Sequence, residues 1–371
     1  MNISNYNYFQ LIIIKISFGF FLLLVLIKNI NLKSIEINNN DFIFFGFLIY
    51  LLISILWSKN TQFGLIKFTI LTVNFFNLWF IIKAYDQIKS NSAFKSVIQF
   101  TILIITIISI ILIFIKPVRF TPEGYELKLF SHVFSGRILT LGYVIVLSLL
   151  YKNYDNLTKS NKIYLIISAT LIFIAQINVA YRAGILSSLL ISAIIFFYFV
   201  KSKEIKLSLN KIFILILVFI FIFALFTENL IHRFNWLLSL INKNEIDDVS
   251  ILARLEAIKI AFHLWKENPI FGSGLGSFNS NISGTNIGLE LKYPHNFFFE
   301  ILSEAGIIGI ILTSIVFYKI FKYLNELRDF EIKLILLLFF IVFFIFATFS
   351  KDLTFNIVLF LFIYLLKLKF Q

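Results

Sequence analysis

Three basic side chains could do chemistry in this sequence, and the first of them is His295. His295 follows Pro294 and opens a long apolar run. A helix N-terminus disfavours the imidazolium form, so we expect this histidine to stay neutral. A neutral imidazole at the edge of a membrane can act as a general base. The alternative is an interfacial histidine that only caps the helix.

The other two are arginines that suit a phosphate-bearing ligand. Arg182 lies in the sequence YRAG at 181–184, a very short link between two apolar runs. A guanidinium beside helix-end N–H groups forms an anion site that fits a diphosphate. Arg254 borders an apolar helical stripe and can direct a second positive charge at the same place. The alternatives are a lipid-headgroup arginine for Arg182 and a solvated helix face for Arg254.

Four further residues are weaker candidates for binding a substrate: Arg119, Arg137, Gly274 and Glu304. The two arginines flank one predicted membrane helix on its outer side. Gly274 is the middle glycine of GSGLG, which we interpret as a tight turn that brings backbone amides near an anion. No Lys-Ser/Thr pair follows it, so a nucleotide loop is not indicated. Glu304 lies in an apolar run, where a carboxylate is costly unless paired, so we expect it to pair with an arginine or to orient the site.

The sequence predicts neither a metal nor a cofactor. Glu245, Asp247 and Asp248 are the one acidic group worth weighing as a divalent-metal site. Three acids without a nearby histidine more often form a solvated helix start, and we expect that here. The chain has no cysteine, which excludes disulfides, thiolate nucleophiles and cysteine metal sites.

The elements that must position these residues are membrane helices. The chain is 59% hydrophobic and 14% charged, against about 45–50% and about 25% in soluble domains. A helix needs about 20 apolar residues to cross a bilayer. We predict an all-α polytopic bundle of about eleven helices, with ten to twelve allowed, at 11–27, 42–57, 64–82, 97–115, 133–151, 163–180, 183–200, 212–226, 296–321, 332–349 and 353–366. The first run lacks a small-residue cleavage site, so we expect it to be retained.

The net charge of +13 is a signal of membrane topology. Lys and Arg concentrate in alternate loops, which places the C-terminus in the cytoplasm. One large outer loop then lies between the eighth and ninth helices. The predicted division is 1–226 for the first membrane helices, 227–294 for the outer loop and 295–371 for the last membrane helices. Nucleic acid is not an expected partner.

The outer loop contains a predicted amphipathic helix. Its apolar stripe recurs at helical spacing and comprises Ile251, Leu255, Ile258, Phe262 and Trp265. Asn268 and Pro269 end the helix. We expect the stripe to lie on the membrane surface or on the mouth of the bundle.

Together these motifs resemble the O-antigen ligase and O-antigen polymerase family. They are YRAGIL from 181, Arg254 followed by NPIFGSGLG from 268, and His295 with Asn296 followed by EAGIIG from 304. The similarity runs from about residue 163 to the end of the chain. The first four predicted helices match only in being membrane helices. The order, spacing and topology of the motifs are more specific than any one of them.

The resemblance implies a bacterial inner-membrane glycosyltransferase of lipopolysaccharide biosynthesis. It implies a large periplasmic loop and transfer of a glycan from undecaprenyl diphosphate to an acceptor glycolipid such as lipid A-core. By motif, the two arginines that handle the diphosphate are Arg182 and Arg254, and the histidine base is His295. Attack opposite the leaving group predicts inversion at the anomeric carbon. Two guanidinium groups supply the charge that a metal would supply, so we expect metal-independent transfer.

The sequence leaves three glycan-related functions open, beside a structural or regulatory membrane protein that would not depend on Arg182 or His295. A ligase, which we favour slightly, joins a finished polysaccharide to lipid A-core. A polymerase joins lipid-linked repeat units to one another. A flippase or other transporter of lipid-linked glycans is of a different class, and one large one-sided loop argues against it, because transporters tend to show paired repeats and interrupted helices.

Overall fold

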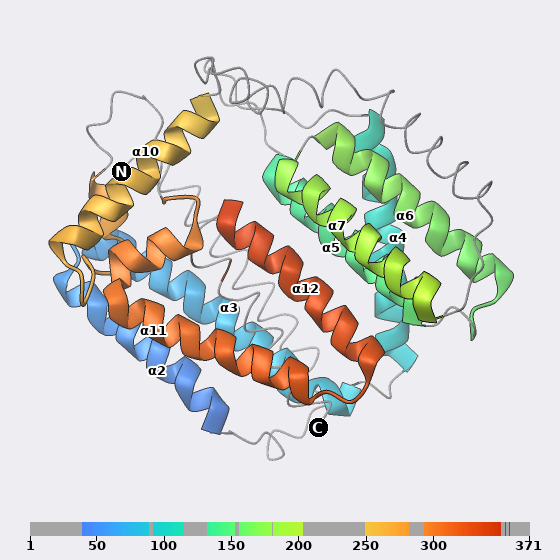
Figure 1. Ribbon diagram of the computed structural model, residues 1–371, viewed down its shortest axis with the longest axis horizontal. Helices are drawn as coiled ribbons and strands as arrows, with labels where there is room; N and C mark the ends of the chain where they lie inside the picture. The colour runs from blue at the N-terminus through green and yellow to red at the C-terminus, as the bar shows by residue number, and fades with distance from the viewer. Residues whose placement is uncertain are drawn as a thin grey trace. The chain divides into compact units, whose positions relative to one another are not determined.

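The computed structural model describes residues 39–88, 92–114, 132–152, 156–179, 181–202, 249–281, 293–349, 353 and 356. Regular structure in these ranges is helical, with no strand (Figure 1). The elements are α2 (Asn39–Ser54), η2 (Ile55–Trp57), α3 (Thr61–Ile88), α4 (Ser92–Phe114), α5 (His132–Lys152), α6 (Lys159–Val179), α7 (Arg182–Ser202), α10 (Val249–Glu267), η4 (Ser277–Asn281), α11 (Phe297–Glu326) and α12 (Phe330–Phe349). The predicted helical fold is confirmed for this part of the chain.

The helices are those of a membrane protein. Four are long and apolar enough to cross a bilayer, over Ser135–Lys152, Lys159–Val179, Phe297–Glu326 and Phe330–Phe349. Three shorter apolar helices cover Asp41–Trp57, Gln99–Phe114 and Arg182–Tyr198. Large apolar side chains such as Phe100, which is 61% exposed, face outward, as lipid contact requires. The predicted helices at 11–27 and 212–226, and nearly all of 353–366, lie outside the described residues, so the number eleven stays a prediction.

The chain divides into two compact units. Unit 1 comprises Met1–Phe94, Val249–Asp329 and Ala347–Gln371, and unit 2 comprises Lys95–Asp248 and Phe330–Phe346. Among the described helices, unit 1 holds α2, α3, α10 and α11, and unit 2 holds most of α4, all of α5 to α7 and most of α12. The division predicted from the sequence concerns the sides of the membrane and stays a prediction.

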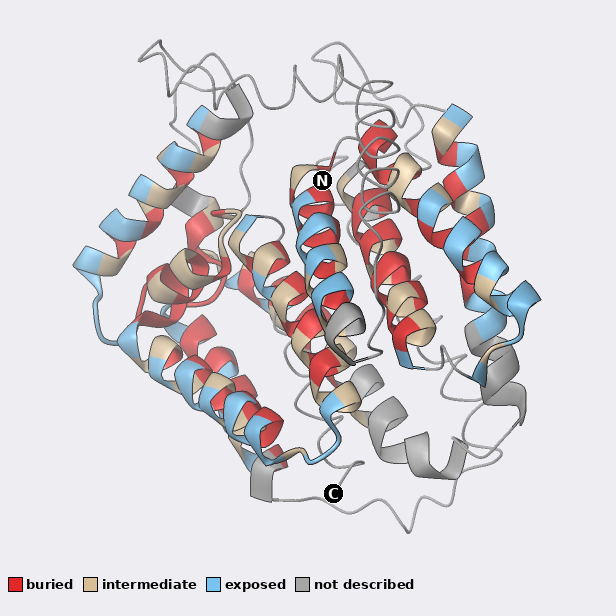
Figure 2. Cartoon of the chain, turned by 45° about the vertical axis from the view of Figure 1, so that its right-hand side comes forward, coloured by how far each residue is buried: buried red, intermediate tan, exposed pale blue. Residues whose placement is uncertain are grey.

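Helix α10 packs on the protein through a face of small residues and leaves the predicted apolar stripe largely exposed. It ends at Glu267, just before Asn268 and Pro269, as predicted. Buried positions recur along one side of this helix (Figure 2). They are Ala253, Ala257, Ala261 and Leu264. In the predicted stripe, Leu255 is 46% and Phe262 is 40% exposed. Alanines let two helices approach closely, so the small face packs on the rest of unit 1. Of the two places expected for the large stripe, the exposed side chains leave the membrane surface as the prediction.

Helix α11 is interrupted. A single run was predicted at 296–321, but Gly306 has φ 64° and ψ −159°, outside the helical region. The helix therefore consists of two pieces, 297–305 and 307–326. The second piece has 20 residues, enough at about 1.5 Å per residue to cross a bilayer, whereas the first has nine.

Candidate functional site

Arg182 is the first residue of α7, and its side chain is half-buried. Tyr181 precedes it, is buried, and lies with its ring centroid 5.8 Å from that of Phe346. A guanidinium at the first helical position lies beside N–H groups that have no partner within the helix. The position predicted for Arg182, beside a helix N-terminus, is therefore confirmed, and its role stays a prediction.

Two glycines hold this end of α7 against α5. A Cβ at Gly136 would lie 2.5 Å from Tyr181 Cδ1, and a Cβ at Gly184 would lie 2.6 Å from Thr140 Oγ1. Real Cβ atoms do not approach other atoms so closely, so only glycine fits at both positions. The two backbones can then approach as they do in small-residue membrane interfaces. Within the sequence YRAG, Tyr181 packs on Gly136 and Gly184 packs on Thr140, and these two contacts fix the position of Arg182 between them.

Arg137, a weaker candidate, is engaged inside unit 2. Its side chain is 7% exposed. One guanidinium nitrogen donates to the Phe346 carbonyl at 3.3 Å, and the guanidinium carbon lies 4.9 Å from the centroid of the Phe346 ring. A cation over an aromatic face gains most when it is desolvated, as this one is. These contacts give Arg137 a structural role in joining α5 to α12.

His295 lies just before α11 in an unusual backbone conformation. Its φ is 56°, in the left-handed region that non-glycine residues seldom adopt, although histidine does so more often than most. Its ring packs on Tyr293, with centroids 4.5 Å apart and planes at 52°. The side chain is half-buried. Such conformations persist only where the surroundings impose them, and they concentrate at functional sites.

The residue that caps α11 is Asn296. Its Oδ1 accepts from the amides of Phe298 at 3.0 Å and Phe299 at 3.2 Å. Its Nδ2 donates to the Thr348 carbonyl at 3.3 Å. This is the geometry of an N-cap, which satisfies amides that have no helical partner. The alternative in which His295 caps the helix is therefore wrong, because the neighbouring asparagine does so.

Arg254 lies on α10, at the border of its buried alanine face. It follows Ala253 directly, precedes Ala257 by three residues, and is half-buried. The sequence placed it beside the large apolar stripe, and this position also adjoins the face that packs on α11. Arg254 and His295 belong to unit 1, and Arg182 belongs to unit 2.

The glycine loop after α10 fills the interruption in α11. The amide of Ser273 donates to Ser303 O at 2.8 Å, and the amide of Gly274 donates to Glu304 O at 2.9 Å. In the other direction, the amides of Ile307 and Ile308 donate to Pro269 O and Ile270 O at 2.9 and 3.2 Å. The Tyr50 hydroxyl donates to Ala305 O at 2.7 Å. The backbone groups that the break removes from the helix thus find partners in unit 1.

The amides of the glycine loop, which were predicted to face an anion, are used in hydrogen bonds within the protein. Besides Ser273 and Gly274, Gly272 donates its amide to Asn268 O at 2.9 Å and Leu275 donates to Ser54 Oγ at 3.2 Å. Four consecutive amides therefore have protein acceptors, and the expectation that they face an anion is wrong for all four. Gly274 has φ 91°, and a Cβ there would lie 2.6 Å from Ser54 O, so the glycine is required by close packing.

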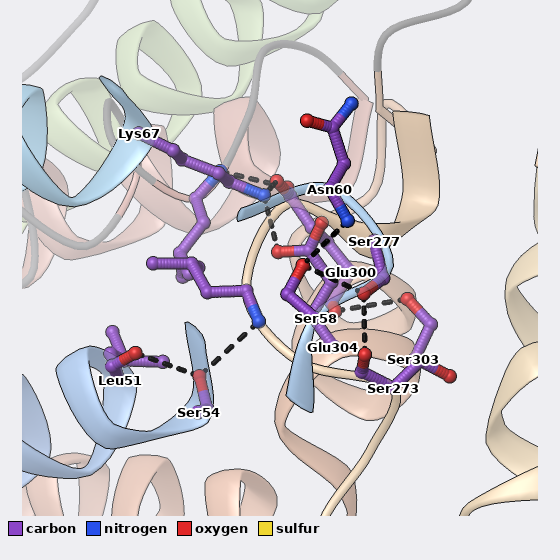
Figure 3. A network of polar contacts seen from close by, with 12 residues as sticks. Leu51, Ser54, Ser58, Asn60, Lys67, Ser273, Ser277, Glu300, Ser303 and Glu304 are labelled. Carbon is purple, nitrogen blue, oxygen red and sulfur yellow. Dashed lines mark hydrogen bonds and ion pairs between the residues drawn. The ribbon is translucent and has the colours of Figure 1, made fainter. Parts of the chain in front are cut away.

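A buried triad lies beside the loop. Lys67 Nζ is 2.5 Å from Glu300 Oε1 and 2.5 Å from Glu304 Oε2 (Figure 3). The three side chains are at most 3% exposed. The expected partner of Glu304 was an arginine, and the observed partner is a lysine of α3. The available signal was the four-residue spacing of Glu300 and Glu304, which places both carboxylates on one helix face.

Serine hydroxyls extend this network to α2 and η2 (Figure 3). Ser277 Oγ donates to the Ser273 carbonyl, which uses its single proton. Ser58 Oγ, 3.0 Å away, must therefore donate to Ser277 Oγ. The Lys59 amide donates to the same oxygen at 3.1 Å. The turn that ends η2 and the glycine loop are thus fixed to each other.

Residues 163–314 match the model of a protein family described as O-Antigen ligase. This part of the chain is similar to O-antigen ligases. The resemblance seen in the motifs is thereby confirmed. No curated protein matches the chain.

The matched range contains all three residues predicted to be catalytic, Arg182, Arg254 and His295. It also contains the glycine loop and both glutamates of the triad. Lys67 and Arg137, by contrast, lie outside the matched range.

Two groups of residues predicted to bind a substrate or a metal lie outside the described residues. They are Arg119 and the acidic cluster Glu245, Asp247 and Asp248. Among the residues that the structure does describe, no three His, Cys, Asp or Glu side chains are grouped as metal ligands.

Proposed function

We propose that the chain is an O-antigen ligase that moves a glycan from undecaprenyl diphosphate to a sugar hydroxyl of an acceptor such as lipid A-core. The family match at residues 163–314 carries this proposal, because it covers the three motifs that contain Arg182, Arg254 and His295. The long apolar helices support a membrane enzyme with a lipid-linked donor. Transfer takes place on the periplasmic side of the inner membrane, where the charge pattern puts the large loop.

Arg182 and Arg254 bind the donor diphosphate. Arg182 supports this role by its place at the first residue of α7, where helix amides add to the guanidinium. Negative charge grows on the diphosphate as its bond to the anomeric carbon breaks. Guanidinium groups stabilise that charge through paired hydrogen bonds, so the reaction proceeds without a metal.

His295 is the general base. It takes the proton of the acceptor hydroxyl while that oxygen forms the new bond to the anomeric carbon and undecaprenyl diphosphate leaves. The anomeric carbon inverts because attack comes from the side opposite the leaving group. Two observations support the role: Asn296 already caps the helix, and the backbone of His295 is held at φ 56° beside Tyr293.

The weaker candidates separate into two groups. Arg119 remains a proposed substrate residue at the outer side of the membrane. Arg137, Gly274 and Glu304 have contacts inside the protein that favour structural roles. We therefore assign donor binding chiefly to Arg182 and Arg254.

Polymerase and transport are the alternatives. A polymerase uses the same donor and the same chemistry with a lipid-linked acceptor. The break in α11 is a feature that transporters also use. Here the freed backbone groups of the break bind a loop of the same unit, which favours a structural explanation.

Lipopolysaccharide gels of a deletion strain distinguish these functions. Loss of a ligase gives core-only bands and accumulates lipid-linked polymer. Loss of a polymerase gives core with one repeat unit, and this result would move the proposal to the alternative. Trapping of single units on the cytoplasmic side would instead indicate a transporter and overturn the enzymatic assignment. Complementation with the wild-type chain is the control.

A further inference from the structure

The first piece of α11 carries His295 at its start and needs outside support. Residues 297–305 form nine residues of helix before the break at Gly306. Helices shorter than about 12 residues are marginal on their own. The break also uncouples this piece from the long second piece. Its orientation must therefore come from tertiary contacts.

At its C-terminal end the piece is held by backbone pairing. The carbonyls of Ser303 and Glu304 accept from the glycine loop, and Ala305 O accepts from Tyr50. These contacts lie at the break, far along the piece from its start. They fix the position of the C-terminal end of the piece. The orientation of its N-terminal end, which carries His295, must come from side-chain contacts.

Lys67 supplies that second constraint. Glu300 lies one turn after the cap residue Asn296, and Glu304 lies one further turn along the same face. Lys67 reaches both from α3, at 2.5 Å each. One ammonium group between two carboxylates one turn apart fixes the tilt of the piece as well as its distance from α3.

Glu300 passes the constraint to the segment after α12. Its Oε2 accepts from the amide of Leu353 at 2.7 Å, while Oε1 faces Lys67. Asn296 adds a hydrogen bond to the carbonyl of Thr348 in the last turn of α12. The first piece of α11 is thus tied to Lys67 of α3 and to the backbones of Thr348 and Leu353, all within unit 1.

We propose that Lys67 is a positioning residue that sets the orientation of His295 by clamping Glu300 and Glu304. The inference rests on the proposed role of His295 as base. A buried ion pair is weak evidence for stability, since apolar replacements of similar volume often fold as well. A directional clamp on a short helical piece is the better explanation of a buried charge at this place. Lys67 acts through the two glutamates and does not touch the substrate.

Two measurements test the clamp together. The chain has no cysteine, so spin labels can be placed at His295→Cys and at exposed Ile49→Cys of α2, both in unit 1. The distance distribution between them reports the position of residue 295 without any assay of activity. Kinetics are measured separately on variants that keep His295, with undecaprenyl-diphosphate glycan as donor.

Lys67→Met should broaden or shift the label distribution. It should also lower kcat by about 10²-fold, the cost of a displacement of about 1 Å, with the donor KM within about twofold of wild type. Lys67→Arg keeps the charge and should restore most of both readouts. Lys322→Met is the matched control, since it removes an exposed ion pair with Glu326 on the second piece of α11. It should change neither readout.

Lys67→Met leaves two buried carboxylates without their lysine, so folding needs its own variant. The triple variant Lys67→Met, Glu300→Gln, Glu304→Gln removes all three charges. It should accumulate in the membrane and show the same broad distribution and low kcat. An unchanged distribution in this variant overturns the clamp, and so does its failure to fold, which would make the triad a folding requirement. A broad distribution with wild-type kcat would instead overturn His295 as base and leave the clamp standing.

Discussion

Gly272 and Gly306 meet backbone to backbone. A Cβ at Gly272 would lie 2.5 Å from the Gly306 nitrogen, and a Cβ at Gly306 would lie 2.5 Å from the Gly272 nitrogen. Both residues have positive φ, 71° and 64°. The loop after α10 and the break in α11 are therefore one structural feature, made by two glycines 34 positions apart. It sets where the first piece of α11 ends and hence where His295 can lie.

Gly272→Ala and Gly306→Ala should both destabilise the protein strongly. Each combines a left-handed backbone, which costs roughly 1–3 kcal/mol for a residue with a side chain, with a collision against main-chain atoms that cannot turn away. Thermal unfolding of the purified protein in detergent measures the effect. Gly46→Ala is the control, since a Cβ there meets nothing within 4 Å. It should leave the midpoint unchanged or slightly raised. Equal midpoints for all three variants would contradict the mutual fit of Gly272 and Gly306.

Asn296→Ala should lower stability by about 1 kcal/mol, the usual cost of a lost N-cap. The same variant also loses the bond to Thr348 O. His295→Asn should cost much less, because asparagine tolerates positive φ. Thermal unfolding again provides the comparison. A larger loss for His295→Asn than for Asn296→Ala would return the capping role to His295.

The helices could be predicted from the sequence because apolar length and helix-stop residues are local properties. The end of α10 follows from Asn268 and Pro269, and the start of α11 follows from the polar residues before Phe297. The break at Gly306 could not be predicted. It lies in a continuous apolar run, and its φ depends on a partner loop that pairs with it only in the folded chain.

In the candidate site, too, local features could be predicted from the sequence and contacts between distant segments could not. The position of Arg182 at a helix start follows from the short link YRAG. The triad does not follow, because Lys67 and Glu304 are 237 residues apart and no local pattern joins them. The buried face of α10 could not be predicted because hydrophobicity points to the large stripe, whereas close packing on α11 selects Ala253, Ala257 and Ala261.

Arg182→Ala should weaken donor binding and slow transfer, because the leaving diphosphate loses a charged donor at a helix start. Arg182→Lys should rescue it poorly, since an ammonium lacks the planar fork that pairs two phosphate oxygens. Donor affinity and transfer rate of each purified variant are the measurements. Full activity of Arg182→Lys would show that only charge matters at this position. Full activity of Arg182→Ala would remove the residue from the site.

Transfer should continue in excess EDTA. The proposed charge on the leaving group is balanced by guanidinium groups, which a chelator does not affect. Turnover of purified protein with and without EDTA tests this directly. A loss of activity that Mg²⁺ or Mn²⁺ restores would contradict the expectation and bring Glu245, Asp247 and Asp248 forward as ligands.

The most direct test of the central claim is the transfer rate of His295→Asn with undecaprenyl-diphosphate glycan and acceptor. Asparagine keeps the backbone conformation accessible and removes the base. We predict nearly normal donor affinity and transfer slower by roughly 10²–10⁴-fold, the usual cost of a lost general base. Wild-type transfer by this variant, at normal protein level, would contradict His295 as the base and with it the proposed mechanism.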